Sequence, residues 1–316
     1  MLDRSSGGSS RRRKYHGRRF VTVLAVGVLA ALAGTAGVLV FRSRTPIIPI
    51  VETERSLDAI QLWQDRQYHQ VEETTTVHLA RYPMDDVSMT LRGLARFYIA
   101  MDLVQPEEVQ EKLVESVQDL RRVLLLTAPQ LEPQVRYVLG KAYFHRGAFF
   151  YDAAIEELHR ARMAGIEQLD LLEYLALAYR ENGEVAEAIR YFREAVDMAG
   201  EDIHRLSLAD LLILQGSYGQ ADALLVAVTD QTADVTLLQH GLLSLGRSYR
   251  AQGRNEEALQ VFERVFTVND TSAEARFQMG ETHLAMDRGD RARFEWREAL
   301  RLNPNHIESF QRLQEY

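Results

Sequence analysis

The sequence contains no cysteine. This absence excludes disulfide bonds, thiolate zinc sites, a cysteine nucleophile and a lipid-modified N-terminal cysteine. It leaves the redox compartment open. In other respects the composition is that of an ordinary globular protein, with 46% hydrophobic and 26% charged residues. A chain of 316 residues is long enough to bury a large core.

Catalytic signatures are also missing. The chain has no HExxH motif, no Walker-type phosphate loop and no GxSxG motif. Its nine histidines are scattered, and His145 and His159 show no metal-ligand spacing with a third ligand. Glu156 and Glu157 are adjacent carboxylates, but neighbouring helical residues point about 100° apart, which favours solvated surface over an acid/base pair. We therefore predict no enzymatic activity, no catalytic residue, no cofactor and no bound metal.

Acidic residues are nearly absent from the N-terminal part of the chain. Residues 1–41 hold seven of the 37 Lys and Arg residues but only one of the 45 acidic residues, Asp3. The remaining part, 42–316, therefore carries 30 basic and 44 acidic residues, a net charge of −14. An acidic body argues against nucleic-acid binding.

A run of 22 residues, 20–41, contains no charge at all. As a helix it would be about 33 Å long, enough to cross the hydrocarbon core of a bilayer. A cleavable signal peptide is the alternative, but its apolar core would be shorter and would end in a small-residue cleavage site. Here Arg42 and Arg44 follow directly. We predict a retained transmembrane helix, with the more basic N-terminal side in the cytoplasm and the body outside.

The segments that flank this run differ from it in composition. Residues 1–19 are rich in Ser, Gly and Arg, which predicts a disordered basic cytoplasmic tail. Residues 42–53 contain Pro46 and Pro49, which predicts a stiff extended linker. Within the run, small residues such as Gly27 and Ala31 are four apart, a spacing that lets membrane helices pack closely. A homo-oligomer through this helix is one possibility.

From residue 54 onward the pattern is helical and repetitive, with no strand-like alternation. Small residues recur every 33 to 37 positions in a first series, which consists of Gly140, Ala176, Ala209, Gly246 and Gly280. The second series is Ala154, Ala188, Ala221, Ala258 and Ala292. Three positions after the first series come Tyr143, Tyr179, Leu212, Tyr249 and His283. Four positions after the second come Leu158, Phe192, Leu225, Phe262 and Trp296. Small residues belong where two helices cross closely, so each unit reads as a helical hairpin.

This period and these positions resemble the tetratricopeptide repeat (TPR). The resemblance covers five repeats over 133–306, and degenerate TPR-like repeats over 54–132, where the helix predicted from Pro106 is too long for the motif. It implies an all-α fold, a right-handed superhelical solenoid of TPR hairpins preceded by one transmembrane helix. Residues 307–316 are expected to form a capping helix, with Asn305 at its start and Ile307, Phe310 and Leu313 directed inward.

In the TPR family the first helices of the hairpins line a groove that receives a peptide or a helix. The matching positions here are Gln134, Tyr137, Lys141, Phe144, Glu173, Leu177, Arg180, Leu206, Asp210, Ile213, Leu243, Arg247 and Arg250. They mix apolar residues with isolated charges of both signs. The asparagines that some TPR proteins use to clamp a C-terminal carboxylate are missing from these positions, so that ligand is not implied.

One turn, between the two helices of the first clear repeat, is two residues longer than later ones and rich in aromatics. Phe149, Phe150 and Tyr151 follow one another there. Turn residues are usually polar, so the three rings are a candidate hot spot for a protein partner. The alternative is that they pack against the degenerate repeat upstream.

The sequence thus predicts a membrane-anchored TPR scaffold or adaptor that binds other proteins and resembles bacterial periplasmic TPR adaptors. Its localisation would be the bacterial inner membrane, single pass, with the TPR domain periplasmic. It would help to assemble an envelope complex of the secretion, pilus, translocon or periplasmic flagellar-motor type. A soluble exported TPR chaperone with a cleaved signal is one alternative, which the mature N-terminus would identify. An organelle import receptor with a cytosolic TPR domain is another, which protease accessibility in intact cells would separate.

The anchor prediction can be checked by deletion. Replacing residues 1–44 with a cleavable export signal should release a soluble and folded body, because the only apolar run long enough to span a bilayer is then gone. Membrane fractionation after a high-salt wash measures this. A body that still pellets with the membranes would show that another part of the chain holds it there.

Overall fold

The computed structural model describes residues 57–126, 129 and 131–316, all within one compact unit that runs from Ile50 to Tyr316. The predicted tail 1–19, the predicted transmembrane helix 20–41 and the predicted linker 42–53 lie outside the described residues. Within the described ranges, none of the helices combines the length and the apolar character needed to cross a membrane.

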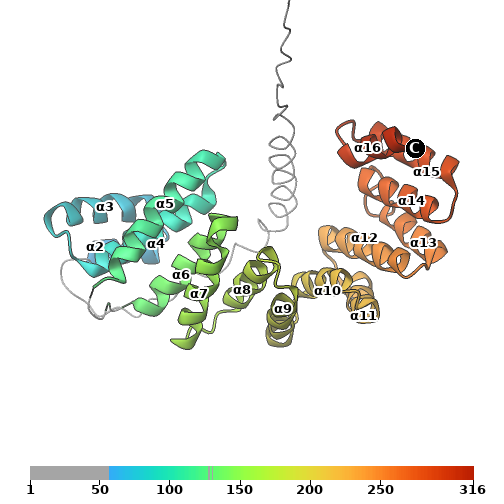
Figure 1. The fold of residues 1–316 in the computed structure, drawn as a ribbon. Helices are drawn as coiled ribbons and strands as arrows, with labels where there is room; N and C mark the ends of the chain where they lie inside the picture. Colours follow the sequence, from blue (N-terminus) through green and yellow to red (C-terminus); the bar gives the residue numbers. More distant parts are fainter. Residues whose placement is uncertain (1–56, 127–128, 130) are drawn as a thin grey trace, which may run out of the picture. The chain divides into compact units, whose positions relative to one another are not determined.

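The described part of the chain is all helical, as predicted, with fifteen α-helices, one 3-10 helix and no strand (Figure 1). The first eight elements are α2 (Leu57–Gln64), α3 (Tyr68–Arg81), α4 (Asp86–Asp102), α5 (Pro106–Val123), α6 (Glu132–His145), η1 (Ala148–Phe150), α7 (Tyr151–Met163) and α8 (Leu169–Glu181). The others are α9 (Val185–Ala199), α10 (Asp202–Gln215), α11 (Tyr218–Gln231), α12 (Val235–Ala251), α13 (Asn255–Val265), α14 (Ala273–Ala285), α15 (Gly289–Leu302) and α16 (Ile307–Glu315).

Consecutive helices pair into seven hairpins, from α2/α3 to α14/α15, and α16 packs on the last of them. The second helix of each hairpin packs on the first helix of the next, which produces the row of hairpins seen in Figure 1. First helices also contact the first helix of a neighbouring hairpin, as in α4 with α6 and α10 with α12, whereas successive second helices make no comparable contact. We call the continuous face made by the first helices, α4 to α14, the inner face.

Glycines set the turn inside several hairpins. Gly183 and Gly253 have φ angles of 84° and 76°, a conformation that side chains with a Cβ rarely adopt. The next amide then bonds back into the helix that is ending, as Glu184 N–H donates to the carbonyl of Tyr179 at 2.8 Å. The two glycines therefore end the first helix of their hairpins, α8 and α12.

The two series of small residues lie where the helices of each hairpin cross, and every member is buried. A Cβ added to Gly140 would lie 2.6 Å from Cγ of Leu158. The rings of Phe262 and Trp296 press in the same way on Gly246 and Gly280. The large residues four positions after the second series are at most 2% exposed. In this part of the chain the small residues thus pack at the helix crossings and the large residues fill the interior beside them.

The same crossing occurs upstream, in the α4/α5 hairpin, where sequence analysis did not identify it. A Cβ on Gly93 would lie 2.7 Å from Leu120, as at Gly140 in the next hairpin. The hydroxyl of Ser116 also donates to the carbonyl of Gly93 at 2.7 Å. The second helix, α5, has 18 residues, so the prediction that it is longer than the repeat motif is correct.

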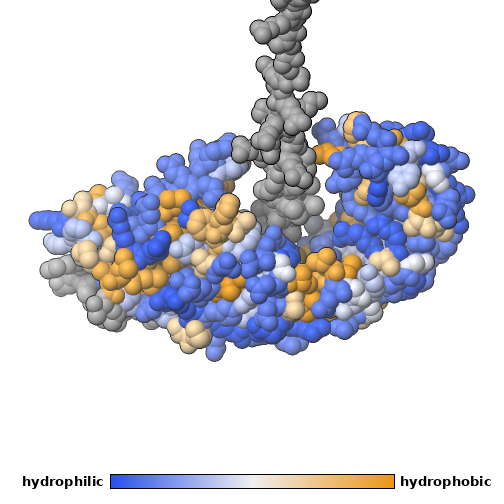
Figure 2. Space-filling model, in the orientation of Figure 1, coloured by the Kyte–Doolittle hydropathy of each residue, from blue (hydrophilic) through white to orange (hydrophobic). Residues whose placement is uncertain are grey.

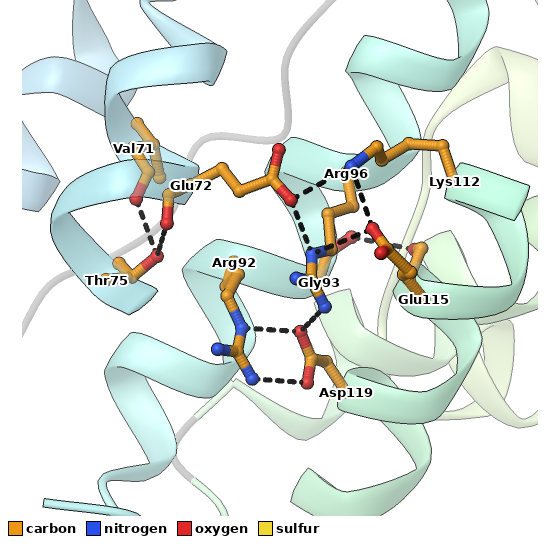
Figure 3. Close-up of polar contacts among 10 residues, drawn as sticks. Val71, Glu72, Thr75, Arg92, Gly93, Arg96, Lys112, Glu115 and Asp119 are labelled. Atoms are coloured by element: carbon orange, nitrogen blue, oxygen red, sulfur yellow. Dashed lines mark hydrogen bonds and ion pairs between the residues drawn. The ribbon is translucent and has the colours of Figure 1, made fainter. Parts of the chain in front are cut away.

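An ion-pair network binds this upstream hairpin to α3 (Figure 3). At its centre, Asp119 of α5 accepts two bonds from Arg92 at 2.7 and 2.8 Å and a third from Arg96 at 2.9 Å. Arg96 also donates to Glu72 of α3 at 2.8 Å. Lys112 reaches Glu72 at 3.1 Å, so α3, α4 and α5 are all joined. The Asp119 side chain is only 2% exposed, and its charge is balanced by two guanidinium groups.

The C-terminal helix α16 differs from its prediction. Its N-cap is His306, whose ring nitrogen accepts a hydrogen bond from the Ser309 amide at 3.3 Å, and not Asn305. Ile307 and Phe310 are 42% and 54% exposed, while Ser309 is fully buried. The helix is thus rotated from the predicted orientation, because it docks through its small and polar residues. The expectation of an apolar inward face was wrong for these two residues.

Overpacking at the crossing should destabilise the body. Ala188→Leu and Ala258→Leu should each lower the free energy of unfolding by about 1–3 kcal/mol, because both methyl groups are fully enclosed. Chemical denaturation followed by circular dichroism measures this. Ala186→Leu, on the exposed side of α9, is the matched control and should change stability by less than about 0.5 kcal/mol. Equal stability of all three variants would contradict the expectation.

Loss of the central carboxylate in the upstream network should be more costly. Asp119→Ala leaves two largely buried guanidinium groups without their shared counter-ion, so stability should fall by about 3–5 kcal/mol. Glu115→Ala removes a more exposed carboxylate of the same network and should cost no more than about 1 kcal/mol. If the two variants unfold at the same denaturant concentration, Asp119 does not have the central role assigned to it.

Candidate functional site

A ladder of polar contacts runs along the inner face and joins α6 to α8, α8 to α10, α10 to α12, and α14 to the α16 segment. Each rung links side chains about one repeat apart in sequence. The rungs are Lys141 with Asp170, Glu173 with His204, Asp210 with His240 and Ser244, Glu274 with His306, and Glu281 with Arg312. Because these contacts join neighbouring repeats directly, they fix how the predicted groove positions are presented.

Four of the predicted groove residues are buried. Tyr137 and Leu206 have no exposed surface, and Lys141 and Glu173 are about 5% exposed or less. The hydroxyl of Tyr137 donates to Asp170, and the ammonium of Lys141 donates to the same carboxylate at 3.1 Å. As direct partner contacts these four predictions are corrected, because the side chains face the next first helix instead of solvent.

Lys141 occupies an aromatic cage. Its Nζ lies 4.9 Å from the ring centroids of Tyr137 and Tyr174 and 5.4 Å from that of Phe97. Burial lowers the pKa of Lys141, although Asp170 opposes the shift. Next to it, burial lowers the pKa of His145 to about 3, so this imidazole is neutral at pH 7 and bonds Tyr174 at 2.9 Å. The cage is an interior polar cluster that ties α4, α6 and α8 together.

The inner face is more open from α10 onward. Asp210 of α10 bonds His240 at 2.8 Å and accepts from the Ser244 hydroxyl at 2.6 Å, both on α12. Burial opposes ionisation of Asp210, but bonds from these groups and the charges of His240 and Arg247 hold its pKa below the ordinary value. Arg247 donates to Ser244 at 2.8 Å and stays 40% exposed.

Arg250, one turn further along α12, has an unsatisfied donor. Its Nη1 is buried and makes no hydrogen bond in the described structure. Burial lowers the pKa of Arg250, which shows how poorly the guanidinium is solvated, although the charge of Glu281 opposes this shift. A buried charged donor without an acceptor is costly, so this position favours an incoming carboxylate or carbonyl oxygen.

The other predicted groove residues keep part of their surface. Gln134, Phe144, Leu177, Arg180, Ile213 and Leu243 are all intermediate in exposure. They and the guanidinium groups of α12 leave the inner face with apolar positions beside cations. Their role in binding a partner stays a prediction.

Sequence analysis missed the contribution of the last repeat. Phe277 and Glu281 of α14 stand one repeat after Leu243 and Arg247, as Gly280 does after Gly246. Glu281 accepts two bonds from Arg312 of α16, at 2.8 and 2.9 Å. Continuing the same interval beyond α12 would have located both α14 residues. Nothing in the repeat pattern points to Arg312, because α16 lies outside it.

The aromatic turn divides into two parts. Phe150 stacks on Tyr143 with ring centroids 5.9 Å apart, and the guanidinium of Arg146 lies over its other side. Tyr151 packs near Phe144. Phe149, at the tip of η1, is 97% exposed. Two of the three rings are therefore held within their own hairpin, and a hot spot stays a prediction for Phe149.

Comparison with known proteins agrees with this architecture. One family model described as a tetratricopeptide repeat matches residues 249–315, and another with the same description matches 150–203 and 175–234. A TPR repeat-containing protein of Bacillus subtilis, YpiA, is 24% identical over 186 residues, which are 58% of this chain. The match spans 42% of that protein's length.

Two solved structures show the same fold. The C-terminal part of a TPR repeat-containing protein from Cytophaga hutchinsonii superposes with a TM-score of 0.60 at 16% identity, covering 80% of this chain and 97% of that one. A tetratricopeptide repeat protein from Parabacteroides merdae gives 0.53 at 16% identity, with coverages of 83% and 96%. Residues 150–234 and 249–315 therefore consist of tetratricopeptide repeats, and the described part of the chain has the fold of a TPR solenoid.

Proposed function

We propose that this protein is a scaffold whose inner face, between α10 and α14, holds an extended segment or a helix of a protein partner. Tetratricopeptide repeats serve as protein-interaction scaffolds. The observation that carries the proposal is the buried Nη1 of Arg250, which has no acceptor in the described structure. A carboxylate on the partner would complete it, with the partly exposed Arg247 beside it on α12.

Apolar anchors next to these cations support the same surface. Leu243 lies on the inner side of α12, and Ile213 lies on α10, each partly exposed. Apolar contacts would supply affinity, while the two arginines would set the orientation and the association rate. A binding surface that consists of such side chains on rigid helices is that of a scaffold rather than of an enzyme.

The location of the scaffold is part of the proposal. The uncharged run 20–41 would anchor the chain in a bacterial inner membrane, with the TPR domain in the periplasm. Support comes from the seven cations that precede the run. Held there, the inner face would gather components of an envelope complex of the secretion, pilus, translocon or periplasmic flagellar-motor type.

The decisive test compares three variants of the full-length chain in detergent. Arg250→Ala and Leu243→Asp, both on α12, should each reduce recovery of a specific partner by about tenfold, because a lost charge-assisted bond or a new charge at an apolar anchor costs about 1.5–3 kcal/mol. Arg190→Ala, a half-exposed arginine of the second helix α9, is the matched control and should retain the partner. Quantitative affinity purification measures recovery, and circular dichroism checks that each variant stays folded. If Arg190→Ala loses the partner and both inner-face variants keep it, the inner face is not the binding surface.

A further inference from the structure

The last repeat has an open cleft on the side of the second helices, away from the inner face. It lies between α13 and α15, and its volume is about 550 Å³. Leu259, Met279 and His283 line it and are all less than 9% exposed. Phe294, which is 56% exposed, lies at its border. A cleft of this size and composition has room for a side chain of a partner protein.

An earlier repeat of the chain shows one way in which this position is filled. Three repeats earlier, His159, Tyr179 and Tyr191 occupy the positions that correspond to Glu263, His283 and Glu295. There the two tyrosine rings stack with centroids 5.5 Å apart, and His159 bonds the Tyr179 hydroxyl at 2.8 Å. In the last repeat two carboxylates and one imidazole replace that cluster of three rings. The last repeat has no aromatic cluster at this position, and the cleft occupies the space.

His283, which replaces one of these rings, is buried but has a polar atom without a hydrogen-bond partner. It is only 6% exposed, and its Nδ1 has no hydrogen-bond partner in the described structure. Burial lowers the pKa of His283, an effect that Glu295 opposes and nearby arginines reinforce. The imidazole is therefore neutral at pH 7, and a neutral ring carries one nitrogen that accepts a hydrogen bond. The cleft thus contains a buried polar group that a ligand could satisfy.

The charge of the cleft indicates the ligand. Four carboxylates line it, against the two guanidinium groups of Arg288 and Arg291. Three of the four are paired with an arginine: Glu256 with Arg288 at 2.9 Å, Glu295 with Arg276 at 3.0 Å and Asp290 with Arg293 at 2.5 Å. Glu263 is exposed and makes no ion pair within the described residues. An apolar floor beside this unpaired carboxylate suits a side chain that has a long hydrocarbon stem and a cationic end.

We propose that this cleft is a second docking site, which takes an arginine side chain from a basic, leucine-containing segment of a protein partner. The stem would lie over Leu259 and Met279, and the guanidinium would meet Glu263 and His283. The site is separate from the inner face, where Arg247 and Arg250 would bind a carboxylate. A scaffold with both sites would hold an acidic segment on one face and a basic segment on the other.

The test uses the full-length chain in detergent and a fluorescent hexapeptide with two arginines set between leucines. Anisotropy should show binding, and a peptide with citrulline in place of arginine should bind at least about tenfold more weakly, because citrulline keeps the shape and loses the charge. Glu263→Gln should weaken binding of the arginine peptide about five- to tenfold. His283→Tyr, which restores the residue found at this position in three other repeats, should fill the cleft and abolish binding. Glu111→Gln, an exposed glutamate on α5, is the matched control and should bind as the wild type does.

Three results would overturn the proposal. Equal binding of the citrulline peptide would show that charge is not recognised. Undiminished binding by Glu263→Gln would show that the peptide lies elsewhere, and this variant decides the matter if His283→Tyr fails to fold. Loss of the peptide from Arg250→Ala, with Glu263→Gln unaffected, would place it on the inner face. The first two results do not bear on whether the inner face takes an acidic segment, so this proposal can fail while the proposed function stands.

Discussion

The close crossing of two helices over a residue with little or no side chain is the constraint on which the rest of this structure depends. At Gly246 and Gly280 the rings of Phe262 and Trp296 occupy the space that any Cβ would need. That contact sets the distance between the helices of a hairpin, and the buried large residue then supports the next hairpin. Because each hairpin is set in the same way, the first helices form one continuous face, and the polar ladder joins several neighbouring pairs of them. Figure 2 shows the result on one side of the molecule, a mainly hydrophilic surface with separate apolar patches.

Steric constraints of this kind can be predicted from sequence, since few residues satisfy them. Gly140 and Ala188 are where the repeat interval placed them, with the large residues in register. The interval failed upstream, where α5 is longer and Gly93 stands out of step with the later series. It also failed at α16, where Ile307 and Phe310 were expected inside. There the buried contacts belong to His306 and Ser309, a polar pairing that periodicity of apolar residues does not detect.

Positions on the inner face were harder to predict, because their burial depends on the neighbouring repeat. Tyr137 and Leu243 hold equivalent places, yet Tyr137 is fully enclosed and Leu243 is partly open. The difference comes from Asp170 on the next first helix, which draws Tyr137 and Lys141 into one buried cluster. The sequence of a single repeat does not show whether the next repeat supplies such a partner. A prediction made repeat by repeat therefore lists the right positions and cannot tell which of them the next repeat covers.

Buried polar atoms without a hydrogen-bond partner are of two kinds. Some belong to the packing of the fold, and others mark candidate binding positions. Trp296 Nε1 has no hydrogen-bond acceptor, but it is wedged on Gly280 in a fully buried ring that no partner can reach. The missing hydrogen bond costs stability, but the ring sets the distance between the two helices where they cross. Arg250 and His283 are different, since one borders the open part of the inner face and the other lines a cleft. In folded proteins nearly all buried polar groups have a hydrogen-bond partner. A buried polar atom that lacks one and lies next to accessible space is therefore a position where a second molecule can supply the missing bond. Among the unpartnered atoms, that of Trp296 thus belongs to the assembly of the fold itself, whereas those of Arg250 and His283 lie at surfaces of opposite charge preference.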